Sequence, residues 1–135
     1  SLKYPELFAA AAPLSAAVFD DQSIETMPDN SWDRTFAQLF GRDMKGKDRL
    51  SKSWYDNSIL KTVDTKSTDD LKKVRYWIDC GDDDFLSNAN CKLHILMTDK
   101  KVPHEFRMRD GAHTWDYWRT GITDALQFIG KSFHQ

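Results

Sequence analysis

The sequence lacks the features of several protein classes. It has two cysteines, Cys80 and Cys91, too few for a disulfide framework and without metal-site spacing, so we expect two free interior thiols. No apolar run reaches the ~18 residues of a membrane span, and the longest candidate, residues 7–19, is broken by Pro13. Its 19 basic and 21 acidic residues leave a net charge of −2, which does not favour nucleic acid or an anionic membrane as a partner.

The second half of the chain alternates strand-like and helix-like segments. Residues 74–80 are rich in β-formers and end at Gly81, whereas residues 104–109 alternate and end at Asp110-Gly111. Helical periodicity covers residues 88–98 and 114–133. We expect these residues to face inward: Ala89, Leu93, Leu96, Met97, Trp118, Ile122, Leu126 and Ile129. Strand, helix, strand and helix at this spacing predict an α/β fold in which residues 71–135 form two βα units of a parallel sheet.

The first half is less regular. Residues 8–14 predict a short buried strand that leaves its sheet at Pro13. Residues 20–70 are polar and predict an insertion over the sheet and its site, with helices over residues 31–40 and about 57–63. Ser31 would cap the first of these helices, Gly41 would end it, and one face would carry Trp32, Phe36, Leu39 and Phe40. Residues 1–8 read like the last turn of a helix stopped by Pro5, as in a fragment of a larger domain.

Polar side chains follow both strands of the second half. Asp82, Asp83 and Asp84 come after the first strand, and His113 comes after the second. Ligands of open parallel sheets collect at the carboxyl ends of the strands. A carboxylate there can fix the tautomer of a neighbouring histidine and stabilise its protonated form. The residues alone also allow a plainer interpretation, in which the aspartates are solvated and the histidine is structural.

Three longer stretches of the sequence resemble a known protein family. Residues 78–86 (Ile-Asp-Cys-Gly-Asp-Asp-Asp-Phe-Leu) and 109–119 (Arg-Asp-Gly-Ala-His-Thr-Trp-Asp-Tyr-Trp-Arg) resemble two signatures of the putative-esterase family of α/β-hydrolases. That family typically has Gly-x-x-Asp-Phe-Leu around its acid and Gly-x-His-x-Trp-x-x-Trp around its base. Residues 2–15 resemble the stretch that follows its nucleophile elbow. The three blocks stand in the family's order, although the insertion is less well matched.

The resemblance implies that the chain is the C-terminal part of one α/β-hydrolase domain. Asp84 then corresponds to the acid and His113 to the base, with Asp83 as the alternative acid. The nucleophile motif Gly-x-Ser-x-Gly is absent and would lie upstream, so the chain alone should be inactive. Ser15 lacks the flanking glycines, and Cys80 has nothing nearby to activate its thiol.

The activity implied is serine-dependent hydrolysis of short acyl or aryl esters, including esters of plant polysaccharide, without cofactor or metal. The partners implied are that substrate and the N-terminal half of the same protein or another copy. The family also favours a secreted or periplasmic location. Trp115 and Trp118 would either anchor the last helix or wall the pocket.

Other functions stay open at this point. A siderophore esterase and an acyltransferase share the same chemistry. In a non-catalytic alternative, carboxylates of the acidic loop bind a divalent cation, with Asp79, Asp82, Asp83 and Asp84 as ligands.

Overall fold

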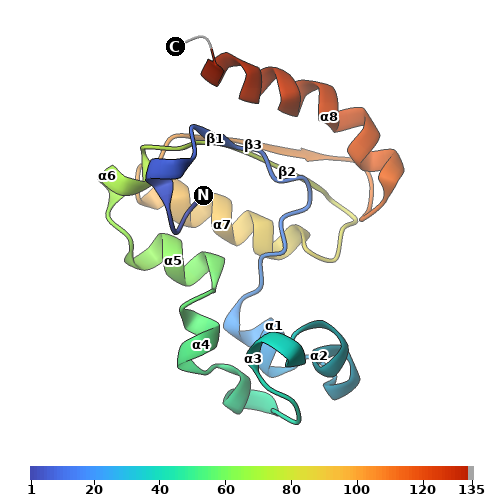
Figure 1. Cartoon of the computed structure of the whole chain (residues 1–135). Helices are drawn as coiled ribbons and strands as arrows, with labels where there is room; N and C mark the ends of the chain where they lie inside the picture. Colours follow the sequence, from blue (N-terminus) through green and yellow to red (C-terminus); the bar gives the residue numbers. More distant parts are fainter. Residues whose placement is uncertain (134–135) are drawn as a thin grey trace.

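A computed structural model describes residues 1–133 and contains one sheet of three parallel strands. The strands are β1 (Ala10–Ala11), β2 (Arg75–Gly81) and β3 (His104–Arg109), and β2 lies in the middle. Helix α7 (Ser87–Asp99) covers one face and helix α8 (Trp115–Gly130) covers the other (Figure 1). The α/β class with parallel strands and flanking helices is therefore confirmed.

Strand β2 carries the core because both of its faces are covered. Alternate side chains of a strand point to opposite faces. Tyr76 and Ile78 pack in the α7 cluster with Leu93 and Met97. Trp77 packs on the opposite face, where Ala125 and Phe128 of α8 cover it. This near-continuous burial is typical of a parallel strand.

The α7 side chains predicted to face inward do so, but the predicted face of α8 was wrong. The buried residues of α8 are Tyr117, Gly121, Ala125 and Phe128, each one position from the predicted set. Ile122 is 42% exposed and Leu126 is 58% exposed. Gly121 and Ala125 are small and let the helix approach the sheet closely. This close packing, and not the hydropathy of the side chains, determines which side of α8 faces the sheet. The larger apolar side chains are left along the flank of the helix.

Strand β1 is shorter and less buried than predicted. It pairs with β2 only through Ala10 and Ala11, and Leu14 adds an isolated bridge to Asp79. The chain turns away at Ser15, whose φ of 55° lies in the left-handed region, and not at Pro13. The end of a helix predicted within residues 1–8 is also absent. A 3₁₀ turn over Pro5–Leu7 begins where Pro5 was expected to stop the helix.

Residues 20–70, which the sequence predicts to be an insertion, form a series of short helices. They are α1 (Asp21–Glu25), α2 (Asp29–Thr35), α3 (Ala37–Phe40), α4 (Lys52–Tyr55), α5 (Ile59–Thr65) and α6 (Thr68–Leu71), with a 3₁₀ turn over Gly46–Arg49. The single helix predicted over residues 31–40 is broken at Phe36, and Ser31 lies inside α2 instead of capping it. Leu39 is 73% exposed, which also contradicts its predicted inward position, whereas Gly41 does end α3.

Helices α1–α4 surround an aromatic cluster of their own. Trp32 and Trp54 are buried there against Phe36 and Phe40, whose rings meet Trp54 at 5.5 and 5.2 Å. This part of the insertion projects away from the sheet on the α7 side (Figure 1). Helix α5 instead joins the main core through Val63. No helix within residues 1–133 has the length and apolar character needed to cross a membrane.

Candidate active site

Asp84 and His113 meet just beyond the carboxyl ends of β2 and β3. Nδ1 of His113 lies 2.9 Å from Oδ2 of Asp84. An ionised carboxylate only accepts hydrogen bonds, so Nδ1 carries the proton and Nε2 is left as an acceptor. This is the tautomer that a general base needs. The Asp84 side chain is fully buried, whereas that of His113 is 35% exposed.

The surroundings of Asp84 favour its charged form. Burial by itself raises the pKa of this carboxyl, but hydrogen bonds from the Ser15 hydroxyl, the Leu86 backbone N–H and His113 outweigh it and hold the pKa below its usual value. The Leu86 N–H donates to Oδ1 at 2.9 Å, leaving Oδ2 to His113. Asp84 therefore stays an acceptor at neutral pH.

Backbone contacts hold the acid loop, which follows β2 (residues 82–86), against the base loop, which follows β3 (residues 110–114). Asp82 N–H donates to the Arg109 carbonyl and Asp83 N–H to the Gly111 carbonyl, both at 3.1 Å. A Cβ on Gly81 would come within 2.0 Å of the Gly111 oxygen, so only glycine permits this approach. The carboxylate of Asp82 also accepts from Gly111 N–H at 3.0 Å, although the residue is exposed. Asp82 thus braces the loops, a role that the expectation of a purely solvated side chain missed.

A hydrogen-bonded network of Asp79, Arg109 and Tyr117 fixes the elements on either side of the His113 loop. Asp79 is 1% exposed and accepts from Nη2 of Arg109 at 3.1 Å and from the Tyr117 hydroxyl. Arg109 ends β3 and Tyr117 lies in the first turn of α8, so both ends of the His113 loop are fixed to β2. Burial and the bond to Asp79 raise the pKa of Tyr117, which stays a neutral donor.

Aromatic side chains enclose the His113 ring. Phe85 lies 4.8 Å from it and Trp118 packs edge-on at 4.9 Å. Trp115 does not anchor α8, since it is 69% exposed and contacts Trp118 at 5.2 Å. Trp118 therefore belongs to the site more directly than Trp115.

Other residues singled out from the sequence lie elsewhere. Asp83 is exposed and the proton of His113 goes to Asp84. Cys80 and Cys91 are free thiols, and burial raises the pKa of Cys80 to about 12, which leaves it unreactive. The four aspartates considered as cation ligands do not converge, because Asp79 and Asp84 are engaged by Arg109 and His113. The carboxylates of Asp82 and Asp83 gather instead with Asp110 at the surface.

Ser15 is the site residue that the sequence analysis undervalued. The sequence shows only that it lacks the flanking glycines of a nucleophile, whereas in the structure its hydroxyl accepts from Nε1 of Trp118 at 2.9 Å and lowers the pKa of Asp84. Its place at the end of the first strand, on the same rim as Asp84, was the available signal.

A cavity of about 630 Å³ lies between the insertion and the start of α7. Its walls include the aromatic side chains Phe19, Phe36 and Phe85, the hydroxyls of Ser23, Ser31 and Thr35, and Arg34. Phe85 is shared between this cavity and the His113 ring. The volume falls in the range of about 300–1,000 Å³ common for small-molecule sites.

Three parallel strands with helices on both faces and a His–Asp pair at the carboxyl edge define part of an α/β-hydrolase fold. The family model described as "Putative esterase" matches residues 1–129, so the chain belongs to that esterase family.

Individual relatives agree with this assignment. An acetyl esterase of Caldicellulosiruptor saccharolyticus is 25% identical over 96% of this chain. A solved ferulic acid esterase superposes on 98% of the chain with a TM-score of 0.69 and 29% identity. FphF, a fluorophosphonate-binding serine hydrolase of Staphylococcus aureus, matches 95% of the chain with a TM-score of 0.64 and 23% identity, which supports the fold. The chain spans 48%, 46% and 48% of these three proteins, respectively.

Proposed function

We propose that this chain supplies the acid, the base and part of the substrate pocket of a serine-type carboxylic ester hydrolase. The observation that carries the proposal is the 2.9 Å hydrogen bond from His113 Nδ1 to Asp84, with Nε2 left as an acceptor on a partly exposed ring. The nucleophilic serine and the oxyanion donors belong to the other half of the fold, as in the family's Gly-x-Ser-x-Gly elbow.

In the proposed reaction His113 moves one proton in each half-cycle. Nε2 takes the serine proton as the serine oxygen attacks the ester carbonyl, and the Asp84 carboxylate stabilises the imidazolium. The imidazolium then gives its proton to the departing alkoxide, leaving an acyl-serine. Water repeats the sequence: Nε2 takes a water proton, hydroxide attacks the acyl carbonyl, and the serine oxygen regains the proton as the acid leaves.

For the substrate we propose short acyl or aryl esters, including esters carried by plant polysaccharide. The aromatic and hydroxyl side chains of the cavity under the insertion fit a planar ring bearing hydroxyl groups. Phe85 links this cavity to the base, because its ring lies 4.8 Å from His113. Phe85→Ala should therefore raise KM for an aryl ester about 10-fold and leave KM for an acetyl ester within about twofold. Equal effects on both esters would contradict this substrate assignment.

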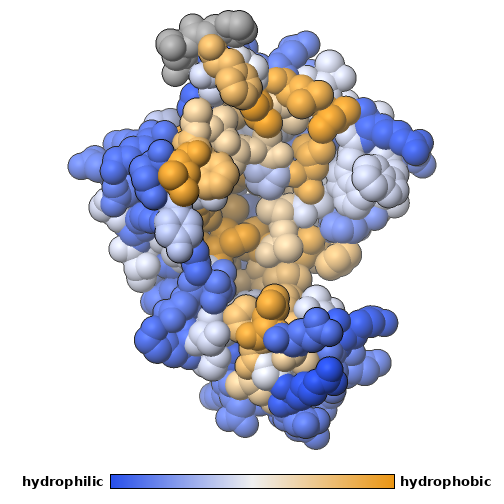
Figure 2. Space-filling view, in the orientation of Figure 1, coloured by the Kyte–Doolittle hydropathy of each residue, from blue (hydrophilic) through white to orange (hydrophobic). Residues whose placement is uncertain are grey.

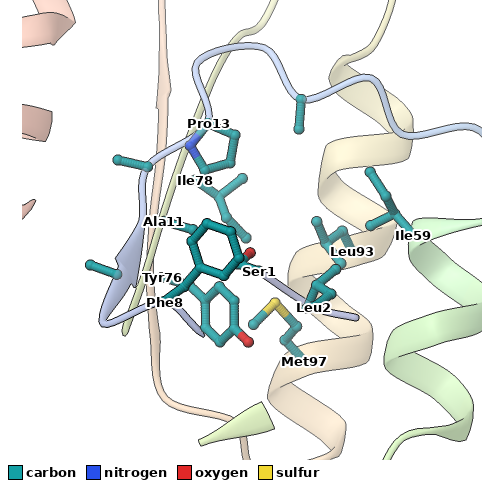
Figure 3. Close-up of a pocket in the computed structure, with 13 residues that line it drawn as sticks. Ser1, Leu2, Phe8, Ala11, Pro13, Ile59, Tyr76, Ile78, Leu93 and Met97 are labelled. Carbon is teal, nitrogen blue, oxygen red and sulfur yellow. The ribbon is translucent and has the colours of Figure 1, made fainter. Parts of the chain in front are cut away.

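The complementary half has a surface to pack against. Strand β1 pairs only with β2, so its outer edge is free among the described residues. Beside it, on the α7 face, lies a cavity of about 460 Å³ whose walls include Leu2, Phe8 and Met97 (Figure 3). Apolar side chains gather over this face of the molecule, between α8 and the insertion (Figure 2).

Two further features point to a protein occupant. Tyr76 lines this cavity and is 4% exposed, and its buried hydroxyl has no hydrogen-bond partner among residues 1–133. Burial raises its pKa to about 12, so it is a neutral donor. On the other face, Trp118 of α8 donates to the Ser15 hydroxyl and Ile129 packs on the cluster around Trp77. The exposed Ile122 lies on the same stripe of α8. We propose that the nucleophile-bearing half of the same protein covers both the cavity on the α7 face and the stripe of α8 on the opposite face of the sheet.

The association arm of the test uses residues 1–135 alone and together with that half. The chain alone should self-associate or unfold easily, because its apolar faces and strand edge are bare. Sedimentation as a compact, cooperatively unfolding monomer would contradict the proposed interface.

The catalytic arm compares Asp84→Asn with Asp83→Asn in the complete enzyme on a chromogenic acetyl ester. Asp84→Asn should lower kcat by about 10⁴-fold, because the amide favours the wrong histidine tautomer. Asp83→Asn is the matched control and should change kcat less than about twofold. The reverse ranking would move the acid to Asp83, and no loss in either variant would remove this loop from the mechanism.

A further inference from the structure

Ser15 occupies an unusual position beside the acid. It is 7% exposed and has a φ of 55°, a left-handed conformation that a non-glycine residue adopts at a cost. Its backbone N–H donates to the Asp79 carbonyl at 2.7 Å, which holds this turn on β2 five residues before the acid. The pairing therefore fixes the serine relative to the strand that leads to Asp84.

The Ser15 hydroxyl connects two elements of the site. Its oxygen accepts from Nε1 of Trp118 at 2.9 Å, so its own proton is directed elsewhere. The hydroxyl also interacts with the Asp84 carboxylate and with the Cys80 thiol, and it lowers the pKa of each. Without Ser15, the indole N–H of Trp118 would lose its partner and the carboxylate would lose a donor.

These contacts close a ring around the base. Asp84 accepts from His113 Nδ1 at 2.9 Å, and Trp118 packs edge-on against the same imidazole at 4.9 Å. Asp84 thus holds the His113 ring through a hydrogen bond and Trp118 holds it through an aromatic contact. Ser15 interacts with both Asp84 and Trp118.

The geometry points to Ser15 as a positioning residue that orients the Asp84 carboxylate and the Trp118 ring about His113. It would act through these neighbours and would not itself attack the ester. This inference rests on the proposed function for its kinetic consequence, but the arrangement of the four side chains has a spectroscopic test that is independent of activity.

The experiment replaces Ser15 in the complete enzyme by two routes. Ser15→Ala removes the hydroxyl at unchanged backbone cost, and Ser15→Gly removes it while relieving the left-handed conformation. Both should lower kcat about 10-fold and leave KM within about twofold, because the base is misoriented while ester binding is kept. Ser15→Cys, which keeps a weak donor in the same place, should recover part of the loss. Ser53→Ala on the exposed face of α4 serves as the serine control and should change neither constant.

Titration of the ¹³C-labelled Asp84 carboxyl provides the second readout. Its midpoint should rise in Ser15→Ala and Ser15→Gly, and the indole N–H of Trp118 should exchange faster with solvent. Trp118→Phe should give a smaller loss of kcat that is not additive with Ser15→Gly, whereas Trp115→Phe should be additive. An unmoved Asp84 midpoint and a protected Trp118 N–H would overturn the inference, even if activity fell.

Failure of the proposed function would look different. A complete wild-type protein that hydrolyses no ester would contradict the esterase proposal, and the titration and exchange measurements would still decide the role of Ser15.

Discussion

Residues 71–133 and helices α1–α4 of the insertion stabilise themselves by different means. The first region is a covered parallel sheet whose loops meet at Asp84 and His113. The second has no strand and gathers around an aromatic cluster, with the guanidinium of Arg49 buried beside it. Hydrogen-bonded loops at the strand ends hold Asp84 and His113 together, whereas side-chain packing shapes one wall of the cavity of about 630 Å³. The proposed chemistry and the proposed substrate preference therefore depend on different regions of the chain.

The two regions also meet in few places. Asp20 caps α1 and pairs with Lys92 of α7. Burial raises the pKa of Asp20, but the hydrogen bonds from Lys92 and Ser23 lower it to about 2. This pair and the packing of α5 on α7 tie the insertion to the sheet. The predictions below test how independent the regions are.

Replacing the base should produce the largest effect. His113→Ala in the complete enzyme should lower kcat by about 10³-fold or more, because base and nucleophile act as a unit. The unfolding midpoint in urea, followed by far-UV circular dichroism, should not move, because His113 is not part of either hydrophobic core. His94→Gln serves as the histidine control in the same ester assay, because His94 contacts His104 at the opposite end of β3 from His113. Retention of most activity in His113→Ala would remove this residue from the mechanism.

Replacing Arg49 should do the reverse and damage the insertion without touching the chemistry. Arg49 is 1% exposed and donates to the carbonyls of Ile24, Met27 and Met44 and to Asp29. Arg49→Met leaves the buried carbonyls without donors and should cost about 3 kcal/mol of unfolding free energy in urea titration.

The control for Arg49 is Lys45, an exposed residue whose Nζ lies 3.5 Å from Oδ2 of the same Asp29. Lys45→Met should cost less than about 0.5 kcal/mol. Cleavage of small acetyl esters should keep its kcat in both variants. A large loss of kcat in Arg49→Met would show that the insertion also positions the base.

Gly81→Ala should strain the contact between the acid and base loops. The added Cβ would meet the Gly111 carbonyl oxygen, which is backbone and cannot move freely. We expect a loss of about 2 kcal/mol in stability and a fall in kcat from the displaced Asp84–His113 pair. Gly130→Ala, where no atom lies within 4 Å of the new Cβ, should be neutral or stabilising. Equal stability of the two variants by thermal denaturation would contradict the close approach of the loops.

The smallest effect concerns two histidines away from the site. Nδ1 of His94 lies 2.7 Å from Nε2 of His104, and the His94 ring stacks on Phe106 at 4.5 Å. Burial and the neighbouring His104 lower the pKa of His94. Its contribution to stability is therefore present above the ordinary histidine pKa of about 6.5 and is lost as pH falls through the lowered value. His94→Gln should shrink the fall in Tm between pH 7 and pH 5 by about 2–4 °C, and an unchanged fall would show that the pair has no role.

The structure confirms much of what could be predicted for residues 71–133. Strands β2 and β3 and helix α7 lie within one residue of their expected bounds, because alternation and helical period are local properties of the chain. The strand ends also predicted that residues 82–84 and His113 share one edge of the sheet. The resemblance to the esterase family then favoured Asp84 over Asp83, and the structure pairs Asp84 with His113. Their catalytic roles remain predictions for the experiments above.

The tertiary structure decided the rest. Hydropathy favoured Trp118 and Ile122 as the inward residues of α8, but the fit of Gly121 and Ala125 against the sheet rotated the helix by one position. The helix predicted over residues 31–40 broke at Phe36, whose ring packs against Trp54 from a distant part of the chain. Ser15 became part of the site only because the parallel pairing of its segment with β2 brings it beside Asp84. Local sequence determines the periodicity and the ends of a helix or strand. Contacts between residues that are distant in the sequence determine its rotation, its breaks and its neighbours, because these contacts form only when the chain folds.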